Sequence, residues 1–76
     1  MKELVEFIAK ALVDHPDQVR VEQTEDNRVI TLELHVAQED MGKVIGKQGR
    51  IAKAIRTVVN AASVNEKKRV MVEIVD

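Results

Sequence analysis

The chain has 76 residues, of which 45% are hydrophobic and 33% charged, and it contains no cysteine. This length allows one hydrophobic core, so we expect a single domain over residues 1–76. The lack of cysteine excludes disulfides and thiolate metal sites. No apolar run approaches the roughly 20 residues that span a bilayer. Because Met1–Glu6 also carries acids where a signal peptide would be apolar, we expect a cytoplasmic protein without membrane contact.

The net charge of −1 conceals a strong asymmetry along the chain. Residues 1–40 hold four Lys or Arg against ten Asp or Glu, whereas residues 41–69 hold eight against one. A partner meets the local field and not the average charge. The basic half therefore predicts an anionic partner.

Apolar residues recur at helical spacing from Lys2 to about Val13 and predict a first helix. Phe7, the only aromatic residue, belongs to this set, so the spacing predicts that it lies in the core. The other members are Leu4, Ile8, Ala11 and Leu12. Pro16 ends the helix, because proline disfavours helical geometry in the residue before it.

Alternating apolar and polar residues predict three strands. A short one lies around Val19–Glu22, the strongest covers Arg28–Val36, and the last covers Val70–Val75. The polar stretch Thr24–Asn27 predicts the turn of a hairpin between the first two. Val29, Met71 and Val75 would then face away from the core.

Two further helices precede the last strand. A short one is predicted over Met41–Ile45, with Gln38–Asp40 supplying an N-cap, and a longer one over about Ile51–Ala62. A crossover through two helices favours parallel strand pairing. The order α-β-β-α-α-β therefore predicts a two-layer α+β fold, in which three helices cover one face of a three-stranded mixed sheet.

Two glycines spaced G-x-x-G stand between these helices, at Gly46 and Gly49. No Asp or Glu occurs from Met41 to Arg56, a stretch that holds five Lys or Arg. A glycine turn at a helix N-terminus presents N–H groups and a positive dipole end to an anion. With these cations around it, we expect a nucleic-acid phosphate, although such glycines can also simply end and start helices.

The segment from Val44 to Arg56 resembles the V-I-G-x-x-G-x-x-I core of the KH domain family. The order of elements resembles the type II arrangement of that family, and the chain length resembles the small stand-alone bacterial KH proteins of the KhpA-like type. In KH domains the G-x-x-G loop clamps the backbone of about four single-stranded nucleotides. The resemblance therefore implies single-stranded RNA binding of low sequence specificity, serving post-transcriptional regulation or RNA chaperoning.

The resemblance also implies a set of RNA-contacting residues around the glycine loop. They are Lys43, Val44, Gly46, Lys47, Gln48, Gly49, Arg50, Ala52, Lys53 and Arg56. Val44 and Ala52 would line the groove for the bases, and Ile45 and Ile55 would anchor it from the core. Ala52 stands where the family pattern has a larger apolar residue, which implies a shallow groove. Lys67-Lys68-Arg69 fits either a second phosphate contact or the protection of an edge strand.

The sequence is compatible with two other classes of function. The outward apolar residues on the sheet favour a dimeric adaptor. KhpA-like proteins imply the same, as a homodimer or paired with a larger KH protein of the Jag type. A helix-turn-helix DNA binder with a recognition helix over Ile51–Ala62 is disfavoured by the flanking strands.

The sequence contains no motif that indicates an enzymatic or a metal-dependent function. Ser63 is the only serine, cysteine is absent, and no nucleophile–base pattern is present, so we expect no enzyme. Neither His15 nor His35 has a second ligand nearby in sequence, so we expect neither a metal nor a cofactor.

Overall fold

The computed structural model describes residues 1–75. In this part of the chain the elements are α1 (Lys2–Leu12), β1 (Arg20–Glu25), β2 (Val29–His35), α2 (Met41–Ile45), α3 (Arg50–Ala62) and β3 (Arg69–Val75). Short 3-10 turns lie at Pro16–Gln18, Gln38–Asp40 and Lys47–Gly49. The predicted order α-β-β-α-α-β is confirmed. Within residues 1–75, every helix is too short or too polar to cross a membrane.

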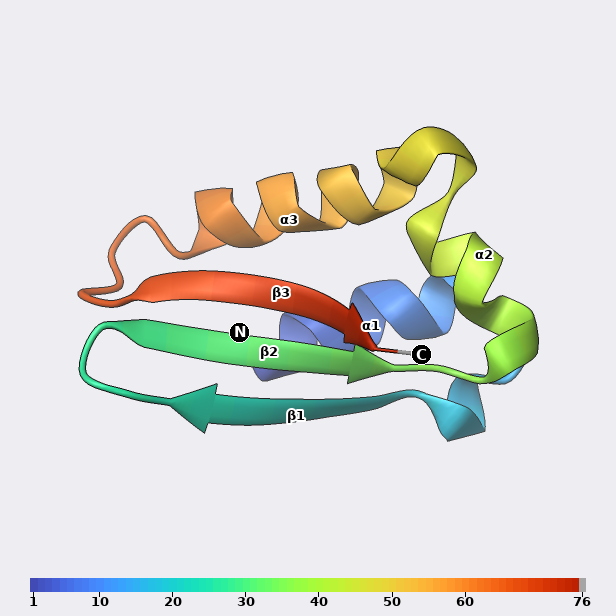
Figure 1. Cartoon of the computed structure of the whole chain (residues 1–76), viewed down its shortest axis with the longest axis horizontal. Helices are drawn as coiled ribbons and strands as arrows, with labels where there is room; N and C mark the ends of the chain where they lie inside the picture. Colours follow the sequence, from blue (N-terminus) through green and yellow to red (C-terminus); the bar gives the residue numbers. More distant parts are fainter. Residues whose placement is uncertain (76) are drawn as a thin grey trace.

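The three strands form one mixed sheet with β2 in the centre (Figure 1). β1 pairs with β2 antiparallel, and β2 pairs with β3 parallel, as the hairpin and the two-helix crossover predict. β1 extends further than expected, to Glu25, because the turn is tightened by Asp26. The Asp26 carboxylate accepts the N–H groups of Arg28 and Val29, each at 2.7 Å, and these bonds hold its pKa below the usual value.

The core lies between one face of the sheet and the helices, so the two-layer α+β architecture is confirmed. Alternate strand residues supply the sheet side, and residues at helical spacing supply the other. The fully or nearly buried members are Val5, Ala9, Val21, Leu32, Leu34, Val44, Ile55, Val59, Val70 and Val72. The helices are thereby fixed against the sheet by apolar burial, which is the main favourable term in folding.

The prediction that Phe7 lies in the core is wrong. Val5 and Ala9 are fully buried in α1, whereas Phe7 is 73% exposed. The apolar stripe of α1 is wider than the part that the sheet covers, and the small Ala9 lets the helix approach closely. Phe7 instead lies beside α3, in a groove described below.

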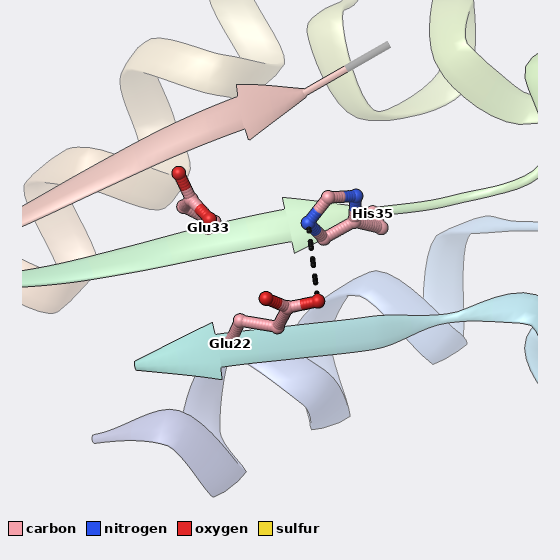
Figure 2. A group of neighbouring side chains, drawn as sticks. All are labelled: Glu22, Glu33 and His35. Atoms are coloured by element: carbon pink, nitrogen blue, oxygen red, sulfur yellow. Dashed lines mark ion pairs between the residues drawn. The ribbon is translucent and has the colours of Figure 1, made fainter. Parts of the chain in front are cut away.

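The sheet face away from the helices bears polar and apolar residues together. Glu22, Glu33 and His35 lie side by side on it (Figure 2). Met71 is exposed there, and Val29 and Val75 are half-buried. Their neighbours along the strands, such as Val70 and Val72, are buried, so the predicted outward orientation of these three apolar residues is confirmed.

Candidate nucleic-acid interface

The G-x-x-G loop connects α2 to α3 through a backbone that only small or flexible residues adopt readily. Gly46 has φ 76° and ψ 173°, Gly49 has φ 73°, and Gln48 between them has φ 58°. The first of these combinations is open essentially to glycine alone, and the others are left-handed. Lys47 and Gln48 lie exposed at the tip of the loop.

Part of the loop backbone is already hydrogen-bonded within the chain. The N–H of Gly46 donates to the Gly42 carbonyl at 2.8 Å, and the N–H of Gly49 donates to the Gly46 carbonyl at 3.1 Å. The N–H of Arg50 donates to the Lys47 carbonyl. The loop amides best placed for a phosphate are therefore those of Lys47 and Gln48 at the tip.

Helix α3 presents three different faces along its length. Ala52, Ile55 and Val59 pack into the sheet. A second face, with Ile51, Ala54 and Val58, lies toward α1. The third carries Lys53, Arg56 and Asn60, which follow Gly49 at i+4, i+7 and i+11 and so continue from the loop along one side of the helix.

This third face borders a small groove between α3 and the free edge of β3. The groove has a volume of about 180 Å³ and is lined by Arg56, Asn60, Arg69, Val70, Met71 and Val72. Arg56 Nε donates to the Val72 carbonyl at 3.2 Å, which ties the side chain to the strand edge. The guanidinium groups of Arg56 and Arg69 thus lie beside the apolar side chains of Val70 and Met71. Such an arrangement suits an anion that is attached to a flat apolar group.

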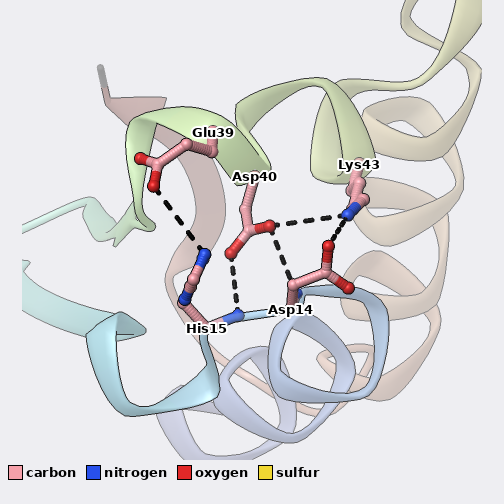
Figure 3. A network of polar contacts seen from close by, with 5 residues as sticks. All are labelled: Asp14, His15, Glu39, Asp40 and Lys43. Atoms are coloured by element: carbon pink, nitrogen blue, oxygen red, sulfur yellow. Dashed lines mark hydrogen bonds and ion pairs between the residues drawn. The ribbon is translucent and has the colours of Figure 1, made fainter.

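Lys43 is engaged differently from the other predicted cations. Its ammonium group pairs with Asp14 and lies 3.7 Å from Asp40 Oδ1 (Figure 3). The hydrogen bond that the Lys43 ammonium group donates to the Asp14 carboxylate is the main cause of the raised pKa of Lys43. The structure therefore places Lys43 in an ion-pair network at the start of α2, with its charge directed at these carboxylates.

Asp40 is the fully buried centre of that network. Its carboxylate accepts the N–H groups of Asp14 at 3.2 Å and of His15 at 2.9 Å, which fixes the chain after α1 against α2 (Figure 3). Burial alone raises the pKa of Asp40, but these two N–H groups and the nearby His15 and Lys43 outweigh burial and lower it. The predicted N-cap bond from this segment is not formed.

Three predicted side-chain positions need correction. Val44 is fully buried and Ala52 nearly so, so neither side chain lines an open groove, whereas Ile45 is 38% exposed and does not anchor the core. The reason is that α2 is short and buries only Val44, so that the next residue, about 100° further around the helix, faces outward. Ile55 is buried, as predicted.

The remaining predicted cations differ in their surroundings. Lys47, Arg50, Lys53 and Arg56 are exposed, and Arg50 Nη2 lies 3.4 Å from the Gln48 side-chain oxygen. In the basic segment before β3, Lys67 is exposed, Lys68 pairs with Glu25 of β1, and Arg69 reaches the groove. Sequence reasoning did not include Asn60 among the site residues, and it left open whether Arg69 contacts phosphate. The i+4, i+7, i+11 spacing from Gly49 would have found Asn60.

Comparison with known proteins agrees with this geometry. Residues 2–74 match the family described as KhpA/KhpB, KH domain. The chain is 67% identical over 75 residues to the RNA-binding protein KhpA of Clostridium acetobutylicum, covering 99% of this chain and 100% of that one. It is 59% identical to the protein of the same name from Halalkalibacterium halodurans and 50% identical to that from Listeria monocytogenes, over 100% of both chains in each comparison.

A solved structure shares the fold at low sequence identity. Era in complex with MgGDPNP and nucleotides 1506–1542 of 16S ribosomal RNA superposes with a TM-score of 0.64 at 22% identity. The match covers 97% of this chain and 30% of the Era chain. Together with the α-β-β-α-α-β order and the glycine loop between two helices, the full-length matches show that the chain belongs to the KhpA/KhpB family of type II KH domains.

Proposed function

We propose that this protein binds single-stranded RNA through the G-x-x-G loop and the face of α3 that continues from it. The observation that carries the proposal is the alignment of Gly49, Lys53, Arg56 and Asn60 on one side of α3, directly after an exposed left-handed loop. Its relatives carry the name RNA-binding protein KhpA, which supports RNA as the ligand. The protein then acts as a cytoplasmic single-domain binding module and not as an enzyme.

The dimensions of this face suit a short stretch of RNA. Asn60 lies eleven positions after Gly49 along the helix, which corresponds to about 16 Å at 1.5 Å per residue. A strand laid along it would meet Lys47 at the loop tip, then Lys53 and Arg56. If about three phosphates are neutralised, log K falls with log[salt] at a slope of roughly −2.

The same face predicts weak base discrimination. Phe7, the single aromatic side chain, lies on α1 in the groove between α1 and α3, and not on the face of α3 that carries Lys53 and Arg56, so no ring stacks on a base along that face. The bases would instead contact the groove beside β3, where Val70 and Met71 offer apolar surface. Low specificity of this kind suits a general role in post-transcriptional regulation or as an RNA chaperone.

The loop is tested by reversing its charge without altering the fold. The variant combining Lys47→Asp with Gln48→Asp should lose most of its affinity for short single-stranded RNA, measured by fluorescence anisotropy. The matched control combines Lys2→Asp with Gln18→Asp, two exposed residues away from the loop, and has the same net charge. Equal RNA affinity of the folded loop variant and the wild type would refute the proposal.

We further propose that the protein self-associates, and a specific surface favours this second function. An apolar groove of about 490 Å³ runs between α1 and α3, lined by Leu4, Phe7, Ile8, Leu12, Arg50, Ile51, Ala54, Ile55 and Val58. Exposed apolar surface of this kind marks contact sites in soluble proteins. The sequence pointed to the outer sheet face for pairing, whereas the exposed apolar residues Phe7, Leu12 and Val58 line this groove.

A second copy of the chain is the simplest occupant of this groove. A twofold axis would bring the stripe of Phe7 and Val58 against the same stripe of the partner, and isologous contacts of this kind are the commonest in homodimers. A larger Jag-type KH protein could present an equivalent surface. Pairing two weak RNA sites would raise the overall affinity without new RNA contacts.

A further inference from the structure

A row of like charges crosses the face of the sheet that the helices leave open. Glu22 of β1 is the direct cross-strand partner of Glu33 of β2, and Glu33 is the direct partner of Glu73 of β3. Carboxylates directly opposite one another on a sheet destabilise it. Arg20 offsets part of this charge, because its Nε lies 2.9 Å from Glu22 Oε1.

An imidazole stands next to this row with an unsatisfied nitrogen. His35 lies two residues after Glu33 on β2 and so on the same face. Its Nε2 is shielded from solvent and has no hydrogen-bond partner within residues 1–75. The Glu22 oxygen that pairs with it lies 3.9 Å away, beyond hydrogen-bond length (Figure 2). A buried polar atom without a hydrogen-bond partner lowers the stability of the folded state, so a partner is expected for it.

These three side chains offer the ligand set of a transition-metal site. One ligand atom from each of Glu22, Glu33 and His35 lies within 4.8 Å of the other two. Around a tetrahedral zinc ion with bonds of about 2.0–2.2 Å, ligand atoms stand about 3.3–3.5 Å apart. Rotation of the side chains would bring the ligand atoms from within 4.8 Å to this spacing. The two paired strands meanwhile hold the three Cα atoms in fixed register.

We propose that Glu22, Glu33 and His35 form a zinc-binding site on the open face of the sheet, with water completing the coordination. One imidazole nitrogen with carboxylate oxygens is a donor set that zinc accepts, whereas Mg²⁺ and Ca²⁺ prefer six or more oxygen ligands. Bound zinc would neutralise the carboxylate row and give His35 Nε2 its missing partner. Residue spacing did not indicate this site, because Glu22 lies on β1 whereas Glu33 and His35 lie on β2.

The site lies on the sheet face opposite the helices that carry the glycine loop and the Lys53–Arg56 face. Helices α2 and α3, which the glycine loop connects, pack against the other face of the sheet. Zinc should therefore raise the thermal stability of the folded chain, since a ligand that binds only the folded state stabilises it. Bound zinc should leave unchanged the affinity of the protein for RNA, which depends on the loop with Lys47 and Gln48.

The test uses the untagged full chain, titrated with Zn²⁺ by calorimetry and by NMR of the histidine side chains. We expect saturation at one ion per chain, shifts at the His35 ring, and an affinity lower by on the order of tenfold or more in His35→Asn and in Glu33→Gln. The control His15→Asn removes the other histidine, whose Nε2 lies 3.7 Å from the Glu39 carboxylate, and should bind zinc like the wild type.

Three results would overturn the site. The first is no saturable Zn²⁺ binding by the wild type, and the second is unchanged affinity in both folded variants. The third is Mg²⁺ binding as tightly as Zn²⁺, which would indicate only a diffuse carboxylate surface. Should His35→Asn fail to fold, Glu33→Gln decides alone, because it conserves the shape of the side chain.

Discussion

The hydrogen at the Cα of Gly46 faces the side chain of Ile51. A Cβ atom at Gly46 would lie 2.5 Å from Ile51 Cγ1 and 2.9 Å from its backbone nitrogen. Real Cβ atoms essentially never come this close to other atoms, and the backbone nitrogen cannot move without disturbing the first turn of α3. The first glycine of the loop is therefore required by packing, in addition to its backbone angles.

The two glycines should consequently differ in their response to alanine. Gly46→Ala should lower the free energy of unfolding by about 3 kcal/mol or more, because overlap with Ile51 adds to a backbone that excludes side chains. Gly49→Ala meets no atom within 4 Å and should lower it by only about 1–2 kcal/mol, the cost of a left-handed residue. Chemical denaturation of both variants measures the difference, and equal losses would contradict it.

Arg56 should contribute charge to RNA binding, in addition to the hydrogen bond that it donates to the Val72 carbonyl. Arg56→Ala removes one cation beside the β3 edge, so the salt slope of RNA binding should become shallower by about 0.7. The exposed Lys10→Ala on α1 removes the same charge elsewhere and should leave the slope unchanged. A loss of affinity at constant slope would show instead that Arg56 contacts a base and not a phosphate.

The sequence predicted the fold well because its signals were local. Alternation over β2 and the paired glycines required nothing from distant residues, and the bounds of α2 agree with the prediction. The side-chain errors at Phe7, Val44 and Ile45 have one cause. Each lies in a helix with apolar residues on more than one face, and periodicity alone does not say which face meets the sheet.

Contacts between distant segments were not predictable from spacing. The bonds from Asp14 and His15 to Asp40 join positions about 25 residues apart, and the Arg56–Val72 bond joins a helix to a strand edge. The cluster of Glu22, Glu33 and His35 depends on the register of β1 and β2. Register follows from the whole hairpin and its buried face, so a residue-by-residue scan misses it.

Self-association should depend on the groove between α1 and α3. Val58→Asp places a charge in that groove and should yield a monomer in analytical ultracentrifugation at concentrations where the wild type is dimeric. Val64→Asp is the matched control, because Val64 is 79% exposed in the loop after α3 and lies outside the groove. A wild type that stays monomeric at high concentration would contradict the proposed dimer.

Acid should destabilise the protein partly through Asp40. Its pKa in the folded chain is lowered below 3.8, so the folded state holds the carboxylate charged more firmly than the unfolded state does. This contribution is therefore fully present above the unfolded value of about 3.9 and is lost as the pH falls through the lowered pKa. Above about pH 5 the stability owed to this group should not change with pH.

The variant Asp40→Asn isolates that contribution. The amide keeps the shape of the side chain but offers one oxygen to the two N–H groups of Asp14 and His15, and it no longer attracts Lys43. Its melting temperature should fall by roughly 5–10 °C at neutral pH, and the difference from the wild type should shrink toward pH 2. Asp17→Asn, an exposed carboxylate in the same region, is the control and should melt like the wild type. A difference that stays constant from neutral pH to strong acid would show that Asp40 acts through its shape and not through its charge.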